Sequence, residues 1–114
     1  MELGDCFRTA YRTFMELNYD GNYRLVHAMI DGQGPVKGLR FVHAWVEDLD
    51  NQVVIDNTLP EDRRILPIRF YYHIAHVDLK ELEGYSMDQV LDYSIKDQTY
   101  GPWNDKFNKI IYLK

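Results

Sequence analysis

Apolar residues recur at helical spacing in the first part of the chain. Between residue 5 and about residue 18 they fall on one stripe that a helix would bury, namely Phe7, Ala10, Tyr11, Phe14 and Leu17. Asp5 precedes this stripe and is a suitable N-cap, which would place Cys6 in the first helical turn. We therefore expect an amphipathic N-terminal helix that ends at the segment NYDGNY.

Strand-like patterns follow this helix. We expect strands at residues 23–30, 39–46 and 53–56, with DGQGP as a loop between the first two and DLDNQ as a hairpin connection between the last two. A fourth run, residues 65–77, is rich in Ile, Phe and Tyr and is also expected to be a strand. Pro67 marks an edge strand or a late start of this run, because proline has no N–H to donate to a neighbouring strand.

The C-terminal part predicts one more helix and one more strand. Ser86 and Gln89 have the spacing of a capping box, so we expect a second helix from residue 86 to about residue 97. The tail turns at Gly101 and Pro102, and its segment KIIYL is expected to form a last short strand. This order of elements indicates an α+β fold in which the N-terminal helix packs on a mainly antiparallel sheet.

The composition narrows the class of protein. A chain of 114 residues, of which 46% are hydrophobic, suits one compact domain, residues 1–114. The net charge of −5 argues against a dedicated nucleic-acid binder, which normally carries a basic surplus. No run is long and apolar enough to span a bilayer, the first residues lack the pattern of a signal peptide, and one cysteine cannot form an internal disulfide. We therefore expect a cytoplasmic protein without a nucleic-acid or membrane partner.

A histidine, His43, interrupts the apolar pattern of one expected strand. Alternate side chains of a strand share a face, so His43 and Trp45 point the same way. If the hairpin closes tightly about residues 50–51, Trp45 lies opposite Asp56, and Asp56 shares the face of His43. Diagonal neighbours of this kind are roughly 7–8 Å apart at the backbone, within reach of an imidazole–carboxylate hydrogen bond. A connection of odd length would instead place Asp56 on the other face.

Cys6 supplies the third group of a candidate triad. A carboxylate on one ring nitrogen of His43 would fix its tautomer and leave the other nitrogen as a base. A thiol in the first turn of a helix lies at the positive end of the helix dipole, which favours the thiolate. Cys6, His43 and Asp56 thus have the chemistry of an activated nucleophile, its base and the group that orients the base.

Three motifs in this order carry a family resemblance. The segments GDCFRTA, HAWVE and VVIDNT resemble the transglutaminase-like branch of the papain-type cysteine peptidase superfamily, over residues 4–58 or about half of the chain. That family has Gly-x-Cys at a helix start, then His-Ala-Trp-Val on one strand and Asp-Pro-Thr at the end of the next. The resemblance implies a transglutaminase-like or papain-like core, with Cys6 as nucleophile, His43 as general base and then acid, and Asp56 orienting His43.

The sequence departs from the family pattern at three places. Asn57 stands where the family has proline, and His27 stands at the expected glycine position, although Arg24 is kept. Five residues precede Cys6, so we expect that the cleft-lining segment of larger relatives is missing. The backbone N–H of Cys6 is then one oxyanion donor, and the second donor is not identified.

Other residues are candidates for lining the site, and each also has a structural interpretation. They are Trp45 as core beside the site, His27 as a buried histidine of the neighbouring strand, and Trp103 as an anchor for the tail. His73 and His76 would lie on opposite faces of a strand, which suits no shared metal. We therefore expect neither a metal nor a cofactor.

The function expected from these residues is cysteine-dependent acyl transfer, of the peptidase, amidase, deamidase or transglutaminase type, on a peptide or protein substrate. The main alternative is a non-catalytic binding or inhibitor protein that keeps the same fold. In that case Cys6 is a small buried apolar residue, and Asp56 bonds the backbone of its own turn. Handling of thioester or lipid acyl groups would use the same triad. Nothing in the pattern bears on oligomeric state.

Overall fold

The centre of the fold is a five-stranded antiparallel sheet with the strand order β4-β3-β2-β1-β5. The computed structural model describes residues 5–17, 21–32 and 37–112, with the backbone alone for 109–112. The strands in these ranges are β1 (Tyr23–Asp31), β2 (Arg40–Asp48), β3 (Val53–Ile55), β4 (Ile65–Pro67) and β5 (Glu83–Tyr85). The α-helices are α1 (Asp5–Leu17), α2 (Ile68–Ile74), α3 (Met87–Asp97) and α4 (Asp105–Tyr112). This architecture confirms the α+β class.

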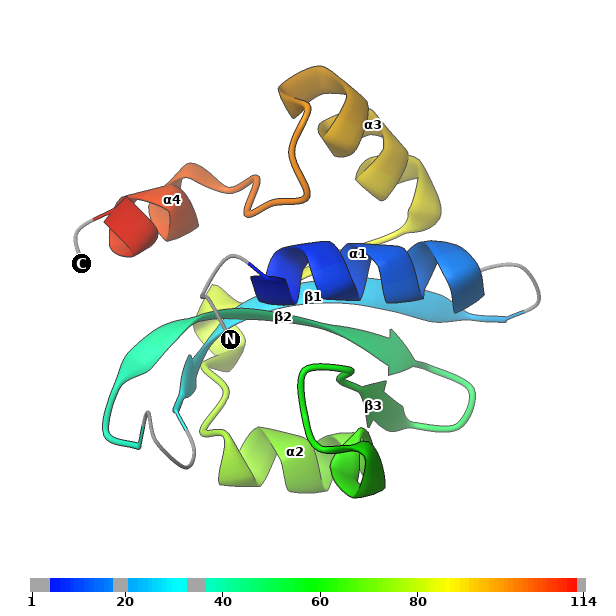
Figure 1. Cartoon of the computed structure of the whole chain (residues 1–114), viewed down its shortest axis with the longest axis vertical. Helices are drawn as coiled ribbons and strands as arrows, with labels where there is room; N and C mark the ends of the chain where they lie inside the picture. Colours follow the sequence, from blue (N-terminus) through cyan, green and yellow to red (C-terminus); the bar gives the residue numbers. More distant parts are fainter. Residues whose placement is uncertain (1–4, 18–20, 33–36, 113–114) are drawn as a thin grey trace.

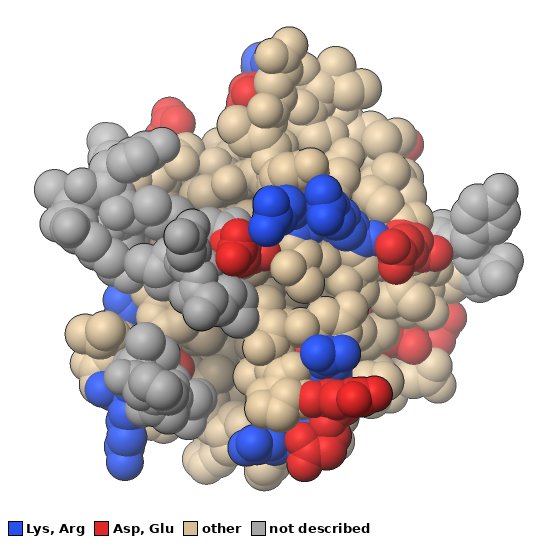
Figure 2. Space-filling model, viewed as in Figure 1, with Lys and Arg blue, Asp and Glu red and all other residues tan. Residues whose placement is uncertain are grey.

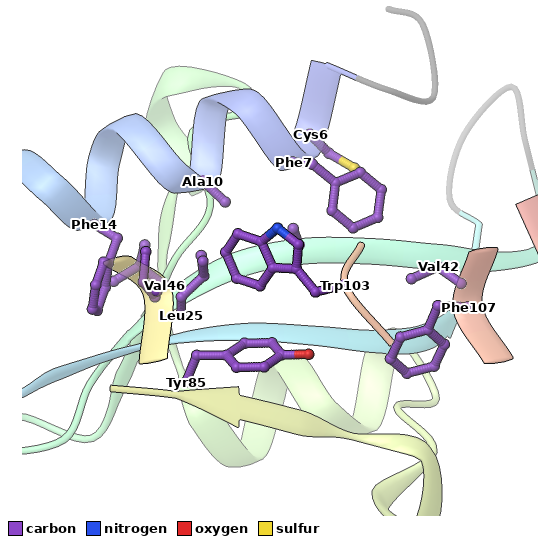
Figure 3. Packing of buried hydrophobic residues seen from close by; sticks show 12 residues of the cluster. Cys6, Phe7, Ala10, Phe14, Leu25, Val42, Val46, Tyr85, Trp103 and Phe107 are labelled. Atoms are coloured by element: carbon purple, nitrogen blue, oxygen red, sulfur yellow. The ribbon is translucent and has the colours of Figure 1, made fainter. Parts of the chain in front are cut away.

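Helices cover both faces of the sheet. Figure 1 shows α1, α3 and α4 on one side of the strands and α2 on the other. The first side holds a hydrophobic cluster that includes Phe14, Val46, Val90, Trp103 and Phe107, part of which is drawn in Figure 3. The second side holds a smaller cluster of Val26, Ala28, Ile30, Trp45, Val54, Tyr71 and Ala75. The central strands β1 and β2 are therefore buried between two separate cores.

Helix α1 forms where the apolar stripe predicts it. Cys6, Phe7, Ala10 and Phe14 are buried against the sheet, as Figure 3 shows. Figure 2 shows that basic side chains along the exposed face of α1 lie between acidic ones, so this face carries no patch of a single sign. The expected N-cap role of Asp5 is wrong, because Asp5 is itself helical. Cys6 is nevertheless in the first turn.

The β2–β3 hairpin has the expected register. Val46 pairs with Ile55 and Asp48 with Val53, so residues 49–52 form a connection of even length. Asp48 accepts hydrogen bonds from the backbone and side chain of Asn51, which hold the turn. Asp56 follows β3 directly and, by continuation of this register, lies opposite Trp45. It is therefore on the face to which His43 points.

The fourth expected strand, residues 65–77, is wrong beyond its first three residues. Only Ile65–Pro67 is a strand, at the edge of the sheet as Pro67 indicates, and Ile68–Ile74 is helix α2. The β-branched and aromatic composition favours a strand, but the inward-facing residues are spaced for a helix. They are Ile68, Tyr71, Tyr72 and Ala75, all packed in the second cluster.

The C-terminal region confirms one expectation and corrects another. Helix α3 begins after Ser86, which forms the expected capping box with Gln89. The expected strand KIIYL is wrong over residues 109–112, which continue helix α4, and Leu113 lies outside the described residues. The side chain of Asn104 accepts from the backbone N–H of Lys106 at 3.0 Å and so caps that helix, while Phe107 packs into the first cluster.

Parts of two expected loops lie outside the described residues. These parts are residues 18–20 of NYDGNY and residues 33–35 of DGQGP, and the second gap extends to residue 36. On either side of the second gap, the backbone N–H of Gly32 donates to the carbonyl of Leu39 at 2.7 Å. On either side of this gap, β1 pairs directly with β2 in antiparallel orientation.

Candidate active site

The three residues of the candidate triad come from three elements. Cys6 is in the first turn of α1, His43 is in the middle of β2, and Asp56 directly follows β3. His43 Nε2 lies 2.8 Å from Asp56 Oδ2, a hydrogen bond between two buried side chains. The hairpin register thus brings imidazole and carboxylate together, as the alternation along β2 and β3 predicts.

Cys6 lies beside the same imidazole. Its thiol is close enough to His43 to contribute to the raised pKa of the ring. Since Nε2 is bonded to Asp56, the second ring nitrogen, Nδ1, is the one available to a thiol. Within the described part of the chain Nδ1 makes no hydrogen bond of standard length and angle. The structure therefore brings all three side chains to one place.

The edge of β2 explains how α1 reaches a side chain of the opposite face. His43 shares a face with Phe41 and Trp45, whose rings lie 5.9 and 6.0 Å from its own, and this is the face covered by α2. The β2–β3 ladder ends where Val46 pairs with Ile55. Beside His43, the described residues of β3 therefore no longer cover the edge, and a group from the other face can approach the ring there.

The charges of the pair follow from its surroundings. Burial would lower the pKa of His43, but the charge of Asp56, the hydrogen bond to it and the interaction with Cys6 together raise the pKa to about 10. Burial would raise the pKa of Asp56, and the charge and hydrogen bond of His43 lower it below its usual value instead. The imidazole is therefore protonated and the carboxylate ionised at neutral pH.

Two residues not identified from sequence complete the environment of Asp56. The hydroxyl of Tyr71 donates to Oδ2 at 2.9 Å. Thr58 donates to Oδ1 twice, from its hydroxyl at 2.6 Å and its backbone N–H at 3.0 Å. The helical spacing of α2 could have indicated that Tyr71 points inward. In the non-catalytic alternative Asp56 is expected to bond the backbone of its own turn, and the contact with the Thr58 N–H is such a bond. It is present together with the hydrogen bond to His43.

Asn57, the residue that follows Asp56, connects the two halves of the site. Its side-chain amide donates to the hydroxyl of Thr13 on α1 at 2.8 Å. Thr13 in turn donates to the carbonyl of Thr9 in the same helix. The turn that carries Asp56 is thereby tied to the helix that carries Cys6, a contact that proline could not make.

Among the expected site-lining residues, Trp45 lies beside the triad. It is buried, its ring packs against Tyr71 at 5.0 Å and His43 at 6.0 Å, and its indole N–H donates to Glu47. Trp45 therefore packs against one side of the imidazole.

His27 and Trp103 lie on the other face of the sheet. The ring of His27 contacts Phe7, Tyr85 and Trp103 at 5.0–5.2 Å. Neither ring nitrogen of His27 has a hydrogen-bond partner among the described residues. Burial, together with a smaller contribution from the charge of His43, lowers its pKa to about 3. The indole N–H of Trp103 donates to the carbonyl of Thr99, which anchors the tail.

The site is enclosed. Only 3% of Cys6, 7% of His43 and 2% of Asp56 is exposed. Exclusion of water strengthens the interactions between these charged groups. The same burial means that a substrate carbonyl reaches the sulfur only when neighbouring groups move aside.

Metal and membrane features are not found in the described part of the chain. No group of three or more His, Cys, Asp or Glu side chains in residues 5–17, 21–32 and 37–112 is arranged to hold a metal ion. His73 lies in α2, and His76, beyond its end, pairs with Asp31, with 2.6 Å between Nδ1 and Oδ2. Over these same ranges, no helix combines the length and the apolar character needed to cross a bilayer.

The surroundings of the three side chains make the site suitable for thiol chemistry, with a charged imidazole between a cysteine and a hydrogen-bonded carboxylate. Comparisons with known proteins add no relative: no protein-family model matches the chain, no curated protein is significantly similar to it, and no solved structure matches it.

Proposed function

We propose that this protein is a cysteine-dependent acyl-transfer enzyme with a Cys6–His43–Asp56 triad on a transglutaminase-like or papain-like core. The observation that carries the proposal is the order of contacts at the imidazole. Nε2 is bonded to Asp56 at 2.8 Å while the Cys6 thiol interacts with the same ring. This order of contacts is the one that the chemistry requires of a nucleophile, its base and the group that orients the base.

The proposed reaction has two halves. The sulfur of Cys6, as thiolate, bonds to a substrate carbonyl carbon, and the bond from that carbon to the leaving nitrogen breaks as the nitrogen takes a proton from His43. The neutral imidazole then takes a proton from water or an amine, whose oxygen or nitrogen attacks the thioester. The carbon–sulfur bond breaks, which restores the thiolate and the protonated imidazole.

The start of α1 supports one part of an oxyanion site. Backbone N–H groups in the first turn of a helix have no acceptor within that helix, so the N–H of Cys6 can donate to the oxyanion. Removing one donor of this kind typically costs about 10²–10³ in rate. Substrates with the required carbonyl are a peptide, an isopeptide or a glutamine side chain, and none of these steps needs a cofactor.

The proposal is tested through the reactivity of the thiol. At pH 7 Cys6 should react with iodoacetamide about tenfold faster than a small thiol of ordinary acidity, and His43→Ala should remove this advantage. Turnover of an activated acyl ester, with and without an added primary amine, then separates hydrolysis from transfer. Equal, slow alkylation of both proteins, together with no turnover, would contradict the proposal.

The burial of Cys6 favours a second candidate, a binding or inhibitor protein with the same fold and no catalysis. With 3% exposure, the sulfur belongs to the hydrophobic cluster that includes Phe7 and Ala10. If this candidate is right, alkylation should occur only from the unfolded protein. Its rate should then rise with low concentrations of urea in proportion to the unfolded fraction. A catalytic site should react at a rate independent of low urea.

A further inference from the structure

Two adjacent tyrosines of α2 each donate a hydroxyl hydrogen bond to a buried carboxylate. Tyr71 donates to Asp56 at 2.9 Å, and Tyr72 donates to Glu47, which is also paired with Arg24 at 2.7 Å. The first carboxylate belongs to the candidate triad, and the second lies further along β2. The two tyrosines thus place the same donor, a phenolic hydroxyl, on Asp56 inside the triad and on Glu47 outside it.

The contacts of Asp56 give the hydroxyl of Tyr71 a specific place. Oδ2 accepts from both His43 Nε2 and the Tyr71 hydroxyl, whereas Oδ1 accepts only from Thr58 among the described residues. The carboxylate group of an aspartate can rotate about the Cβ–Cγ bond unless hydrogen bonds hold both of its oxygens. With Thr58 holding one oxygen and Tyr71 the other, Oδ2 is directed at the imidazole.

We propose that Tyr71 is a positioning residue of this site, and that its hydroxyl holds Asp56 ionised and oriented so that His43 turns its Nδ1 towards Cys6. Tyr71 touches none of the reacting atoms of the proposed reaction. It acts through Asp56 and then His43, and its catalytic meaning rests on the proposed function. Its ring is held by packing against Trp45 at 5.0 Å, so the hydroxyl is fixed in place.

Loss of the hydroxyl should alter the titration of the site in a defined direction. The titratable groups facing Asp56 are His43 from β2, Tyr71 from α2 and, through the imidazole, Cys6 from α1. Burial raises the pKa of the carboxyl, but the charge of His43 and the hydrogen bonds from His43, Thr58 and Tyr71 together lower it below its usual value. Without Tyr71 the carboxyl should therefore take up a proton at higher pH, and activity should be lost at a higher pH on the acidic side.

The test compares Tyr71→Phe with Tyr72→Phe. The two residues are adjacent in α2, and each substitution removes only a hydroxyl group. We expect Tyr71→Phe to lower kcat about tenfold with KM nearly unchanged, and to move the acidic limb of the pH profile for Cys6 alkylation upward. Tyr72→Phe should weaken folding to a similar extent but leave the profile unchanged. If both profiles match that of the unaltered protein, or both shift equally, Tyr71 is not a positioning residue.

The outcome is separable from that of the proposed function. Suppose that Cys6 alkylation in the unaltered protein depends on pH, that its acidic limb shifts only in Tyr71→Phe, and that no acyl turnover occurs. This result would support the positioning role of Tyr71 and contradict the proposed acyl-transfer activity. If Tyr71→Phe does not fold, NMR of the unaltered protein decides. The Tyr71 hydroxyl proton should be slow to exchange and show cross-relaxation to the His43 ring, and a rapidly exchanging hydroxyl overturns the proposal.

Discussion

His27 and His43 lie on neighbouring strands and are both buried, yet they are held in opposite charge states. His27 has no exposed surface and contacts aromatic rings, and burial, with a smaller effect of the His43 charge, lowers its pKa to about 3. His43 experiences a similar loss of water, but Asp56 and Cys6 raise its pKa to about 10. Burial therefore does not determine the charge of a core histidine; the presence of a partner does.

The two faces of the sheet explain this difference. In the β1–β2 ladder His27 pairs with Ala44 and Ala28 pairs with His43, so the two histidines point to opposite sides. The side of His27 is filled by Phe7, Tyr85 and Trp103 and offers its ring no hydrogen-bond partner within the described residues. The side of His43 carries the carboxylate. The two histidines therefore differ in charge because only the side of His43 offers the ring a carboxylate partner.

The largest change in the charge of His43 should come from removing its partner. In Asp56→Asn the pKa of His43 should fall from about 10 to near or below the ordinary 6.5, since burial then acts with little opposition. Acyl transfer should fall about 10²–10⁴-fold. NMR titration of the ring protons measures the shift. Asp48→Asn, which alters a carboxylate bonded within its own turn, should leave it unchanged, and a His43 pKa that stays near 10 in Asp56→Asn would contradict this account.

The packing around His27 is tested at Gly101. This residue has φ +112°, and a Cβ there would lie 2.6 Å from His27 Cε1. Gly101→Ala should lower the free energy of unfolding by about 2–4 kcal/mol, from backbone strain and from overpacking together.

The matched control is Gly38→Ala. Gly38 has φ +92°, but a methyl group added there would meet no described atom within 4 Å, so only the backbone cost of about 1–2 kcal/mol should remain. Urea denaturation of both variants measures the difference. Equal losses would mean that His27 is not tightly enclosed.

The two histidines should also affect the pH dependence of stability, each in a separate pH range. The pKa of His27 is lowered to about 3, so the unfolded chain binds a proton first and stability should fall as the pH drops below 6.5. The pKa of His43 is raised to about 10, so its contribution is complete below pH 6.5 and is lost as the pH rises towards 10.

Between pH 6.5 and 5 the loss from His27 should be about 2 kcal/mol. His27→Leu should reduce the loss of stability at acidic pH and leave the loss at alkaline pH unchanged. His43→Gln should reduce the loss at alkaline pH and leave the loss at acidic pH unchanged. Thermal denaturation at several pH values checks both. An acidic slope that persists in His27→Leu would show that another group is responsible.

Much of the site can be predicted because it depends on local patterns. The alternation along β2 places His43 and Trp45 on one face, and an even hairpin connection places Asp56 on the same one. The stripe of α1 puts Cys6 in a first helical turn. Each of these depends on residues close together in the chain, where periodicity is visible in the sequence.

Other parts could not be predicted, for identifiable reasons. The composition of α2 indicates a strand because Ile, Phe and Tyr favour strands, although Tyr71 and its inward-facing neighbours have helical spacing. The contact of Asn57 with Thr13 joins residues that are far apart in sequence, and no local pattern marks it.

The starts of most helices and strands, and the faces that side chains share, can be predicted because they follow from neighbours a few residues away. The neutral state of His27, the protonated state of His43 and the contact of Cys6 with His43 arise from the tertiary fold. The physical reason is that a pKa depends on the water removed from a group and on the charges brought beside it. Both are products of contacts between distant segments.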